Sequence, residues 1–358
     1  MLECGREAWD FVTALRTPHS VFKERLTMDN RERFQRTLNF QPVDRLPRLE
    51  WATWWDKTLE RWYEEGLPRE LTAGEDLYHY FALDDHRQCW ISPDGPACPV
   101  PANHGGPLIA DRADYLDIKK HLYPEEAFDS AAIEAWAARQ RAGKTVVWIT
   151  LEGFFWWPRK LFGIEPHMYA FYDQPGLMKE INEDLLKFNL RALKKFCAVC
   201  TPDFITFAED MTYNHGPMLS ERLFDDFVAP YYARIVPVLK DYGILPIIDS
   251  DGDIKEIVPW FEKMGIDGFL PLERQAGVDI AELRRDYPQL RIIGGFDKMV
   301  MHLGEERMRM EFERLLPVMR QGGYIPSVDH QTPPEVSLKQ YRLYLRLLEE
   351  YSIKAAKP

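Results

Sequence analysis

Short apolar runs alternate with longer amphipathic stretches along most of the chain, and this alternation constrains the fold more than any other feature. Each run of strand-type residues is followed by a polar turn and then by a helical pattern of roughly 10 to 20 residues. The runs lie at 45–52, 77–85, 145–153, 204–211, 244–252, 266–273, 290–297 and 323–330. Eight strand-then-helix units predict an α/β protein of the closed (β/α)8 type, a TIM barrel.

Length alone leaves the domain organisation open, because 358 residues fit one large barrel or two small domains. A new helix start follows Met28, with Asp29 or Asn30 as its cap, so residues 1–27 are expected to form an N-terminal extension. Residues 28–358 are expected to form a single barrel, with an insertion after the second strand that makes a small hairpin and lid over about 86–144. A doubly wound open sheet is the alternative, but no GxGxxG or GxxxxGK[ST] motif supports it.

The charge balance narrows the class of partner. The chain has 45 Lys and Arg against 57 Asp and Glu, a formal charge of −12, which argues against nucleic acid because such binding depends on basic patches. It has no apolar run of about 18 residues, the length that a membrane-spanning helix needs, and its first residues do not resemble a secretory leader. We therefore expect no membrane association and a cytoplasmic location.

The ends of the predicted strands are unusually acidic. In a (β/α)8 barrel the chemistry takes place at the carboxyl ends of the strands. The residues found there are Glu50, Asp84, Asp85, Glu152, Glu209, Asp210, Asp249, Asp251, Asp253, Glu273, Asp297, Asp329 and His330. Carboxylates that converge raise one another's pKa unless a cation or a proton lies among them, so a positive species is expected at this end. Some of these acids can instead cap the helices that follow.

The turn from Asp249 to Asp253 is the most specific part of this pattern. Its three alternate carboxylates resemble the start of an EF-hand, but Ile254 and Trp260 stand where that loop needs Gly and Glu. A metal site at the barrel mouth remains. Its expected ligands are Asp249, Asp251, Glu273 and His330, and the alternative is a hydrogen-bonded polar network without a metal.

Aromatic residues gather after the same strands. Those expected to bind substrate are Trp51, Trp54, Trp55, Phe154 and Tyr213. A cleft with aromatic walls and a few acids suits a planar, largely apolar ligand. Core or lid packing is the alternative role for any of them.

Several segments resemble the uroporphyrinogen decarboxylase superfamily. They are RERFQRTLNFQPVDRLP from Arg31, residues 208–232, the DSDGDI turn with GIDGFLPLERQAGVDI, IIGGFDK, and GGYIPSVDHQTPPEVSLKQY. The resemblance covers about residues 28–351 in the same order. It implies a (β/α)8 barrel with its active site at the carboxyl ends of the strands.

The superfamily divides into two activities. Its decarboxylases hold the propionates of a tetrapyrrole with paired arginines near the first strand, and the matching stretch here, LEWATWWDKTLERWYEEGLP, lacks them. The other branch is similar in fold and comprises corrinoid-dependent methyltransferases, whose thiol-activating members use a His-x-Cys motif. Asp249 and Asp251 stand at those positions, and no cysteine matches. An oxygen-and-imidazole site is harder than a thiolate site and suits polarisation of an ether oxygen.

The resemblance therefore implies a methyltransferase of the O-demethylase type, with a small aromatic methyl ether as methyl donor and zinc as the metal. Cobalamin is expected on a separate corrinoid protein, because the signature Asp-x-His-x-x-Gly is absent here. Glu209 or Asp210 is expected to stabilise the leaving phenolate, and the family suggests a homodimer. Two alternatives stay open. One is a metal-free decarboxylase or lyase of a small carboxylated substrate with Asp84 or Asp210 as the acid, and the other is a non-catalytic ligand-binding protein.

Overall fold

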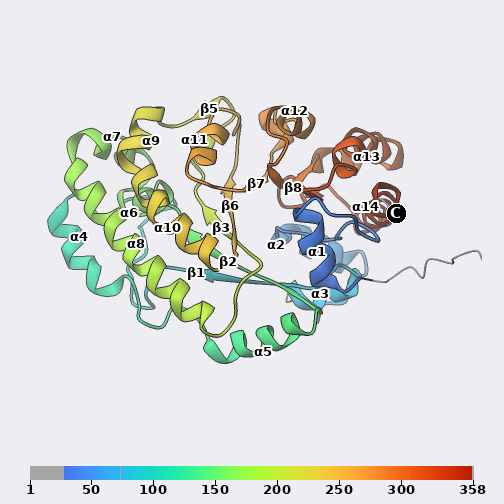
Figure 1. Cartoon of the computed structure of the whole chain (residues 1–358), viewed down its shortest axis with the longest axis horizontal. Coiled ribbons are helices and arrows are strands. Elements are labelled where there is room, and N and C mark those ends of the chain that lie inside the picture. The colour runs from blue at the N-terminus through green and yellow to red at the C-terminus, as the bar shows by residue number, and fades with distance from the viewer. Residues whose placement is uncertain (1–27, 73, 357–358) are drawn as a thin grey trace, which may run out of the picture.

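A parallel sheet forms the centre of the protein, whose computed structural model describes residues 28–72 and 74–356 (Figure 1). Its seven strands neighbour one another in the order β1-β2-β3-β6-β7-β8-β9. They are β1 (His86–Ile91), β2 (Val146–Glu152), β3 (Phe204–Ala208), β6 (Leu245–Ser250), β7 (Gly268–Pro271), β8 (Arg291–Phe296) and β9 (Tyr324–Val328). A separate antiparallel pair joins β4 (Thr212–Tyr213) to β5 (Gly216–Pro217). The curled parallel sheet is consistent with a TIM-barrel fold.

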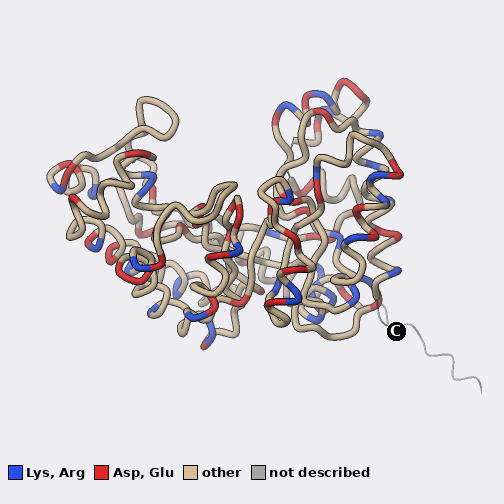
Figure 2. Tube along the Cα trace, turned by 90° about the horizontal axis from the view of Figure 1, so that it is seen from above, with Lys and Arg blue, Asp and Glu red and all other residues tan. Residues whose placement is uncertain are grey.

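Helices lie outside the strands (Figure 1). They are α1 (Asn30–Leu38), α2 (Asp56–Glu64), α3 (Gly74–Tyr80), α4 (Arg112–Ile118), α5 (Ser130–Arg141), α6 (Trp156–Phe162), α7 (Ile164–Asp173), α8 (Pro175–Cys197), α9 (Glu221–Phe227), α10 (Ala229–Asp241), α11 (Val258–Lys263), α12 (Ile280–Asp286), α13 (Glu305–Met319) and α14 (Leu338–Ala355), with 3-10 turns η1 (Lys119–His121), η2 (Arg274–Ala276) and η3 (Lys298–Leu303). Within the described ranges, none of these helices is both long enough and apolar enough to cross a membrane. Acidic and basic residues are interspersed along much of the described trace (Figure 2).

The helix α1 closes one end of the sheet interior. A buried cluster joins its Phe34 and Leu38 to inward-facing residues of the strands, among them Val146 and Phe204. The rings of Phe34 and Phe204 stack with centroids 5.3 Å apart. Because Val146 and Phe204 begin their strands, α1 covers the amino ends. The carboxyl ends are therefore the open end, where a ligand can enter.

Six of the eight predicted strands are confirmed, and two are wrong. Residues 77–80 are the end of α3 instead of part of a strand, because Leu77 and Tyr78 bury one face of this helix. The strand at this point is β1, which begins at His86 and whose polar residues hid it from a search for apolar runs.

The predicted first strand at 45–52 belongs to no ladder, and the described residues hold no eighth strand of the sheet. Residues 46–51 instead fill the gap between β1 and β9 through isolated contacts. The carbonyl of Arg48 accepts from the Asp84 N–H at 2.8 Å, and Trp51 Nε1 donates to the Val328 carbonyl at 2.8 Å. Pro47 has no N–H to give to a ladder, which disfavours regular pairing here.

The predicted hairpin over 86–144 is also wrong. This region begins with β1 and continues as a loop to α4 and α5. Strand-like pairing between residues 92 and 144 is limited to a single bridge between Asp94 and Leu122. The predicted extension, residues 1–27, lies outside the described residues.

Asp84 lies at the end of the sheet opposite to the one predicted. Since β1 starts at His86, Asp84 precedes the strand and sits at its amino end. Both of its oxygens accept from Arg45, Oδ1 from Nη2 at 2.6 Å and Oδ2 from Nη1 at 2.8 Å. Its carboxylate thus holds the segment around Arg45 against the start of β1, away from the open end.

The buried His86 predicts a loss of stability in acid. Burial lowers the pKa of His86 to about 4, against about 6.5 in an unfolded chain. Below pH 6.5 the unfolded chain therefore binds a proton at this histidine, whereas the folded chain does not. The free energy of unfolding falls until the pH reaches the folded pKa. When the pH is lowered from about 7.5 to 4.5, protonation of His86 in the unfolded chain is expected to lower the free energy of unfolding by about 2.5 kcal/mol. Urea unfolding at both pH values should show a smaller difference in His86→Asn, and an equal difference would contradict this.

Candidate metal and acid site at the open end of the sheet

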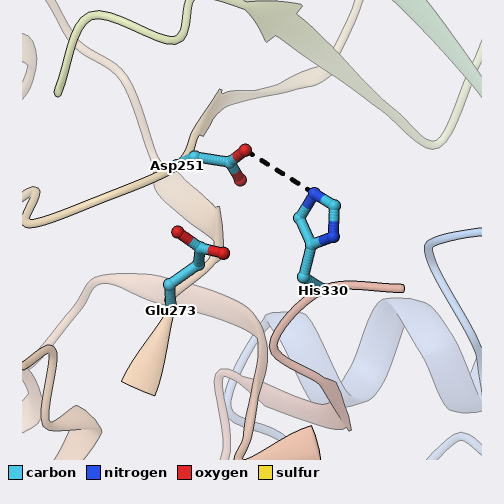
Figure 3. A group of neighbouring side chains, drawn as sticks. All are labelled: Asp251, Glu273 and His330. Atoms are coloured by element: carbon cyan, nitrogen blue, oxygen red, sulfur yellow. Dashed lines mark ion pairs between the residues drawn. The ribbon is translucent and has the colours of Figure 1, made fainter. Parts of the chain in front are cut away.

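Three side chains from different strand ends converge at the open end (Figure 3). Asp251 follows β6, Glu273 follows β7 and His330 follows β9. Each offers one ligand atom, and these atoms all lie within 4.8 Å of one another. The Nε2 atom of His330 is 3.6 Å from Asp251 Oδ2. We refer to Asp251, Glu273 and His330 as the mouth cluster.

The turn after β6 is shaped to bring the cluster together. Gly252 has φ +83°, and a Cβ there would come within 2.7 Å of the Tyr213 backbone, so this position requires glycine. The N–H of Gly252 donates to Glu273 Oε2 at 3.1 Å and ties the two loops together. Leu272 and Asp210 have φ +66° and +26°, values that are uncommon outside glycine. Such backbone strain is concentrated at functional sites.

A lysine that the sequence analysis missed lies beside the cluster. The Nζ atom of Lys298 is 3.7 Å from Glu273 Oε1 and 3.3 Å from Asp329 Oδ1. Asp329 is fully buried and also accepts from the N–H groups of Arg274 and Lys298. A positive charge among the acids was expected, and Lys298, which directly follows the acidic end of β8, supplies part of it.

Two buried aspartates next to the cluster, Asp210 and Asp249, have raised pKa values. Burial, and then the charge of Asp251, raise the pKa of Asp210 to about 6. Burial together with Asp210 and Asp251 raises the pKa of Asp249 well above its usual value. Burial acts to lower the pKa of His330, but the neighbouring Asp251 carboxylate outweighs it, so that the pKa is raised. The open end therefore holds excess negative charge that a cation would relieve.

The donors of the mouth cluster fit a metal ion. Two carboxylates and one imidazole are donors that zinc and harder divalent ions accept, with further positions left for water or substrate. The structure thus brings together three of the four predicted ligands. Asp249 is not part of the ligand group, and the charges of Asp210 and Asp251 help to raise the pKa of its carboxyl.

Glu209 lies behind the site. It is fully buried and accepts four hydrogen bonds, from the N–H groups of Phe154, Phe155 and Trp156 and from the Tyr232 hydroxyl, at 2.9 to 3.2 Å. Burial raises its pKa to about 8, while the three N–H donors at the start of α6 and the Tyr232 hydroxyl favour the ionised form. With its oxygens used in this way, Glu209 anchors α6 to β3.

Gly153 provides a test of that anchor. A Cβ at this position would lie 1.8 Å from Glu209 Oε2 and 2.7 Å from the Ala208 carbonyl. We expect Gly153→Ala to lower the free energy of unfolding by about 3 kcal/mol, because the carboxylate has no room to retreat. Gly176→Ala is the matched control, since a Cβ there meets nothing within 4 Å. Urea unfolding measures both, and equal values would contradict the anchoring role.

The predicted aromatic residues separate into two groups. Trp54 and Phe154 are both buried in the core. Trp54 packs among aromatic rings that include Trp62, and the ring of Phe154 stacks on that of Tyr231. Their predicted place in a cleft wall is wrong. Trp51 lies beside the cluster, with its ring centroid 6.1 Å from that of His330.

Tyr213 and Trp55 remain accessible. Tyr213 is 49% exposed and touches the Gly252 turn, while Trp55 is 41% exposed at the start of α2. The ring of Trp51 therefore lies beside the cluster, and Tyr213 adjoins the site through its backbone, which packs against the Gly252 turn.

Comparison with known proteins agrees with this architecture. The family described as "Uroporphyrinogen decarboxylase (URO-D)" matches residues 162–351, more than half of the 358 residues. The chain belongs to this family. The matched part begins in α6 and ends in α14, so it includes every residue of the mouth cluster.

Structural similarity outside the family match is more distant. One solved structure, the "Putative Vitamin-B12 Independent Methionine Synthase from Listeria monocytogenes", is 13% identical in sequence. The alignment covers 88% of this chain and 99% of the other chain, with a TM-score of 0.43. Similarity at this level does not bear on the activity. No curated protein matches the chain.

Proposed function

We propose that this member of the uroporphyrinogen decarboxylase family is a corrinoid-dependent methyltransferase. Its reaction would move the methyl group of a small aromatic methyl ether to cob(I)alamin on a separate corrinoid protein, leaving a phenolate. The observation that carries the proposal is the convergence of Asp251, Glu273 and His330 within 4.8 Å at the open end of the sheet. In a family that divides between decarboxylation and methyl transfer, a cluster of metal-ligand type favours the second.

The mouth cluster would hold a zinc ion. When bound, such an ion supplies Lewis-acid polarisation of an oxygen atom. The chain itself fixes the ligands in place: Gly252 N–H holds Glu273, and the ring of His330 lies edge-on to Trp51. Lys298 would partly neutralise Glu273 until the ion binds.

Asp210 is the residue best placed to handle the proton of the leaving group. Its Oδ1 accepts from the Asp251 N–H at 3.1 Å, which leaves Oδ2 to hold a proton and give it to the phenolate oxygen. A phenolate leaves more readily when its oxygen is protonated as the C–O bond breaks. Trp51 and Tyr213 would provide apolar contact for the aromatic ring.

The charge at the open end disfavours a tetrapyrrole with many carboxylates. The charge of Asp251 helps to raise the pKa values of Asp210 and Asp249, and a further carboxylate would meet the same repulsion. A neutral methyl ether brings no such cost.

A metal-free decarboxylase or lyase is the second candidate. It is favoured by the ion pairs inside the site, because Asp251 faces His330 and Glu273 faces Lys298. In that case Asp210 would protonate the carbon that loses carbon dioxide. The two candidates differ in their product.

The test is transfer of a methyl group to free or protein-bound cob(I)alamin. The purified protein is incubated anaerobically with cob(I)alamin and a panel of methoxyarenes, and methylcobalamin and the matching phenol are measured together. We expect both to form in equal amounts, with none from the ethyl ethers used as controls. Release of carbon dioxide from aromatic carboxylates without any methylcobalamin would reject methyl transfer in favour of the second candidate.

A further inference from the structure

A cavity lies at the carboxyl ends of β1 and β2. It has a volume of about 720 Å³, which falls in the range of small-molecule sites. Its walls come from the ends of these strands, the loop from 92 to 108, α6 and the first residue of α7. Asp251, Glu273 and His330 do not line it, and the contact between the two regions passes through Arg159, whose Nη1 donates to the Asp210 carbonyl at 3.3 Å.

The cavity walls are largely apolar. The loop over residues 95–110 contains no Lys, Arg, Asp or Glu, and four prolines stiffen it. Trp90, Val100 and Ile164 line the cavity while remaining 49%, 85% and 47% exposed. Large apolar side chains that are exposed around one hollow indicate a binding site for an apolar molecule.

One polar group in the cavity lacks a partner. The side chain of Glu152 is only 2% exposed. Its Oε1 accepts from Lys160 Nζ at 3.1 Å and from Trp90 Nε1 at 3.3 Å. Its Oε2 is buried and has no hydrogen-bond partner. A buried carboxylate oxygen without a donor is costly, so a donor brought by a ligand would be favoured here.

The charges around Glu152 select the kind of donor. Lys160 Nζ is shared between Glu152 and Asp94 Oδ2, each at 3.1 Å. A ligand ammonium at Oε2 would be repelled by the nearby Lys160 ammonium. A ligand carboxylate would be repelled by the Glu152 carboxylate. An uncharged O–H or N–H donor meets neither repulsion.

We propose that this cavity is a second ligand site, which takes an uncharged, mainly apolar ring molecule with one hydrogen-bond donor directed at Glu152 Oε2. The site does not depend on the methyl transfer proposed above, because it has its own polar anchor and shares no lining residue with the mouth cluster.

A matched pair of probes tests the hydrogen bond. Indole has one N–H donor and 1-methylindole has none, while their rings are the same. Isothermal titration calorimetry on the full chain should show one indole bound per chain, and about tenfold weaker binding of 1-methylindole. Indole-3-acetate should also bind more weakly. Equal affinities for indole and 1-methylindole, or no binding of either, would overturn the proposal.

Two tryptophan substitutions test the location. Ile164→Trp narrows the cavity and should abolish indole binding. Leu303→Trp is the matched control, since Leu303 is 56% exposed and lies outside the cavity. Asp251→Ala should leave indole affinity unchanged. Indole binding that survives Ile164→Trp, or is lost in Asp251→Ala, would place the ligand elsewhere and overturn the site.

Discussion

Purified without chelator or nickel resin, the protein is expected to carry about one zinc ion per chain, and Asp251→Ala or His330→Ala to lose it. The reason is geometric, because the cluster offers three donors and the removal of either one leaves two, too few for a stable site. Inductively coupled plasma mass spectrometry of the three proteins measures the loss directly. It requires no knowledge of the substrate.

Asp253→Ala is the matched control. It removes a carboxylate from the same turn, but Asp253 faces Lys255, with Oδ2 3.2 Å from Nζ. Zinc should be retained in this variant. A folded wild-type protein that binds no divalent ion even after addition of zinc would reject the metal centre. The ion pairs of Asp251 with His330 and of Glu273 with Lys298 would then be the resting arrangement of the site.

Strand positions could be predicted where strands are continuous apolar runs between turns. The strands that end at Glu152 and Ala208, for example, are buried on both faces, as parallel strands between helices should be. The strand β1 was not predicted, because Arg87 and Gln88 interrupt its apolar character. Arg87 is buried only because it pairs with Glu75 and Asp85, and such pairing cannot be seen in a local window of sequence.

The mouth cluster could be anticipated because the carboxyl ends of parallel strands meet at one edge of a sheet. That rule predicts that Asp251, Glu273 and His330 lie together, without any knowledge of distances. It could not separate Glu209 from Asp210, since neighbouring residues at a strand end point in different directions. Glu209 turns toward the start of α6, whereas the side chain of Asp210 reaches the Asp251 backbone. Only the three-dimensional structure distinguishes an anchor from a candidate acid.

Asp210→Asn should lower kcat for methyl transfer by about 10²- to 10³-fold while leaving the zinc content unchanged. Asparagine keeps the size of the side chain and the acceptor for the Asp251 N–H, but it cannot give a proton to the leaving oxygen. The loss should depend on the substrate. It should be largest for ethers of weakly acidic phenols and small for ethers with electron-withdrawing ring substituents, whose phenolates leave without protonation.

The dependence on the leaving group separates proton transfer from a structural effect of Asp210→Asn. Measured across a series of substituted methoxyarenes, log kcat of the variant should fall more steeply with the pKa of the phenol than that of the wild type. Asp297→Asn supplies the control, because Asp297 also follows a strand but caps η3 through the Met299 N–H. A uniform loss across the series, or the same loss in Asp297→Asn, would mean that Asp210 holds the site together without donating the proton. The acid would then have to be sought among the groups around Lys298, whose ammonium reaches both Glu273 and Asp329.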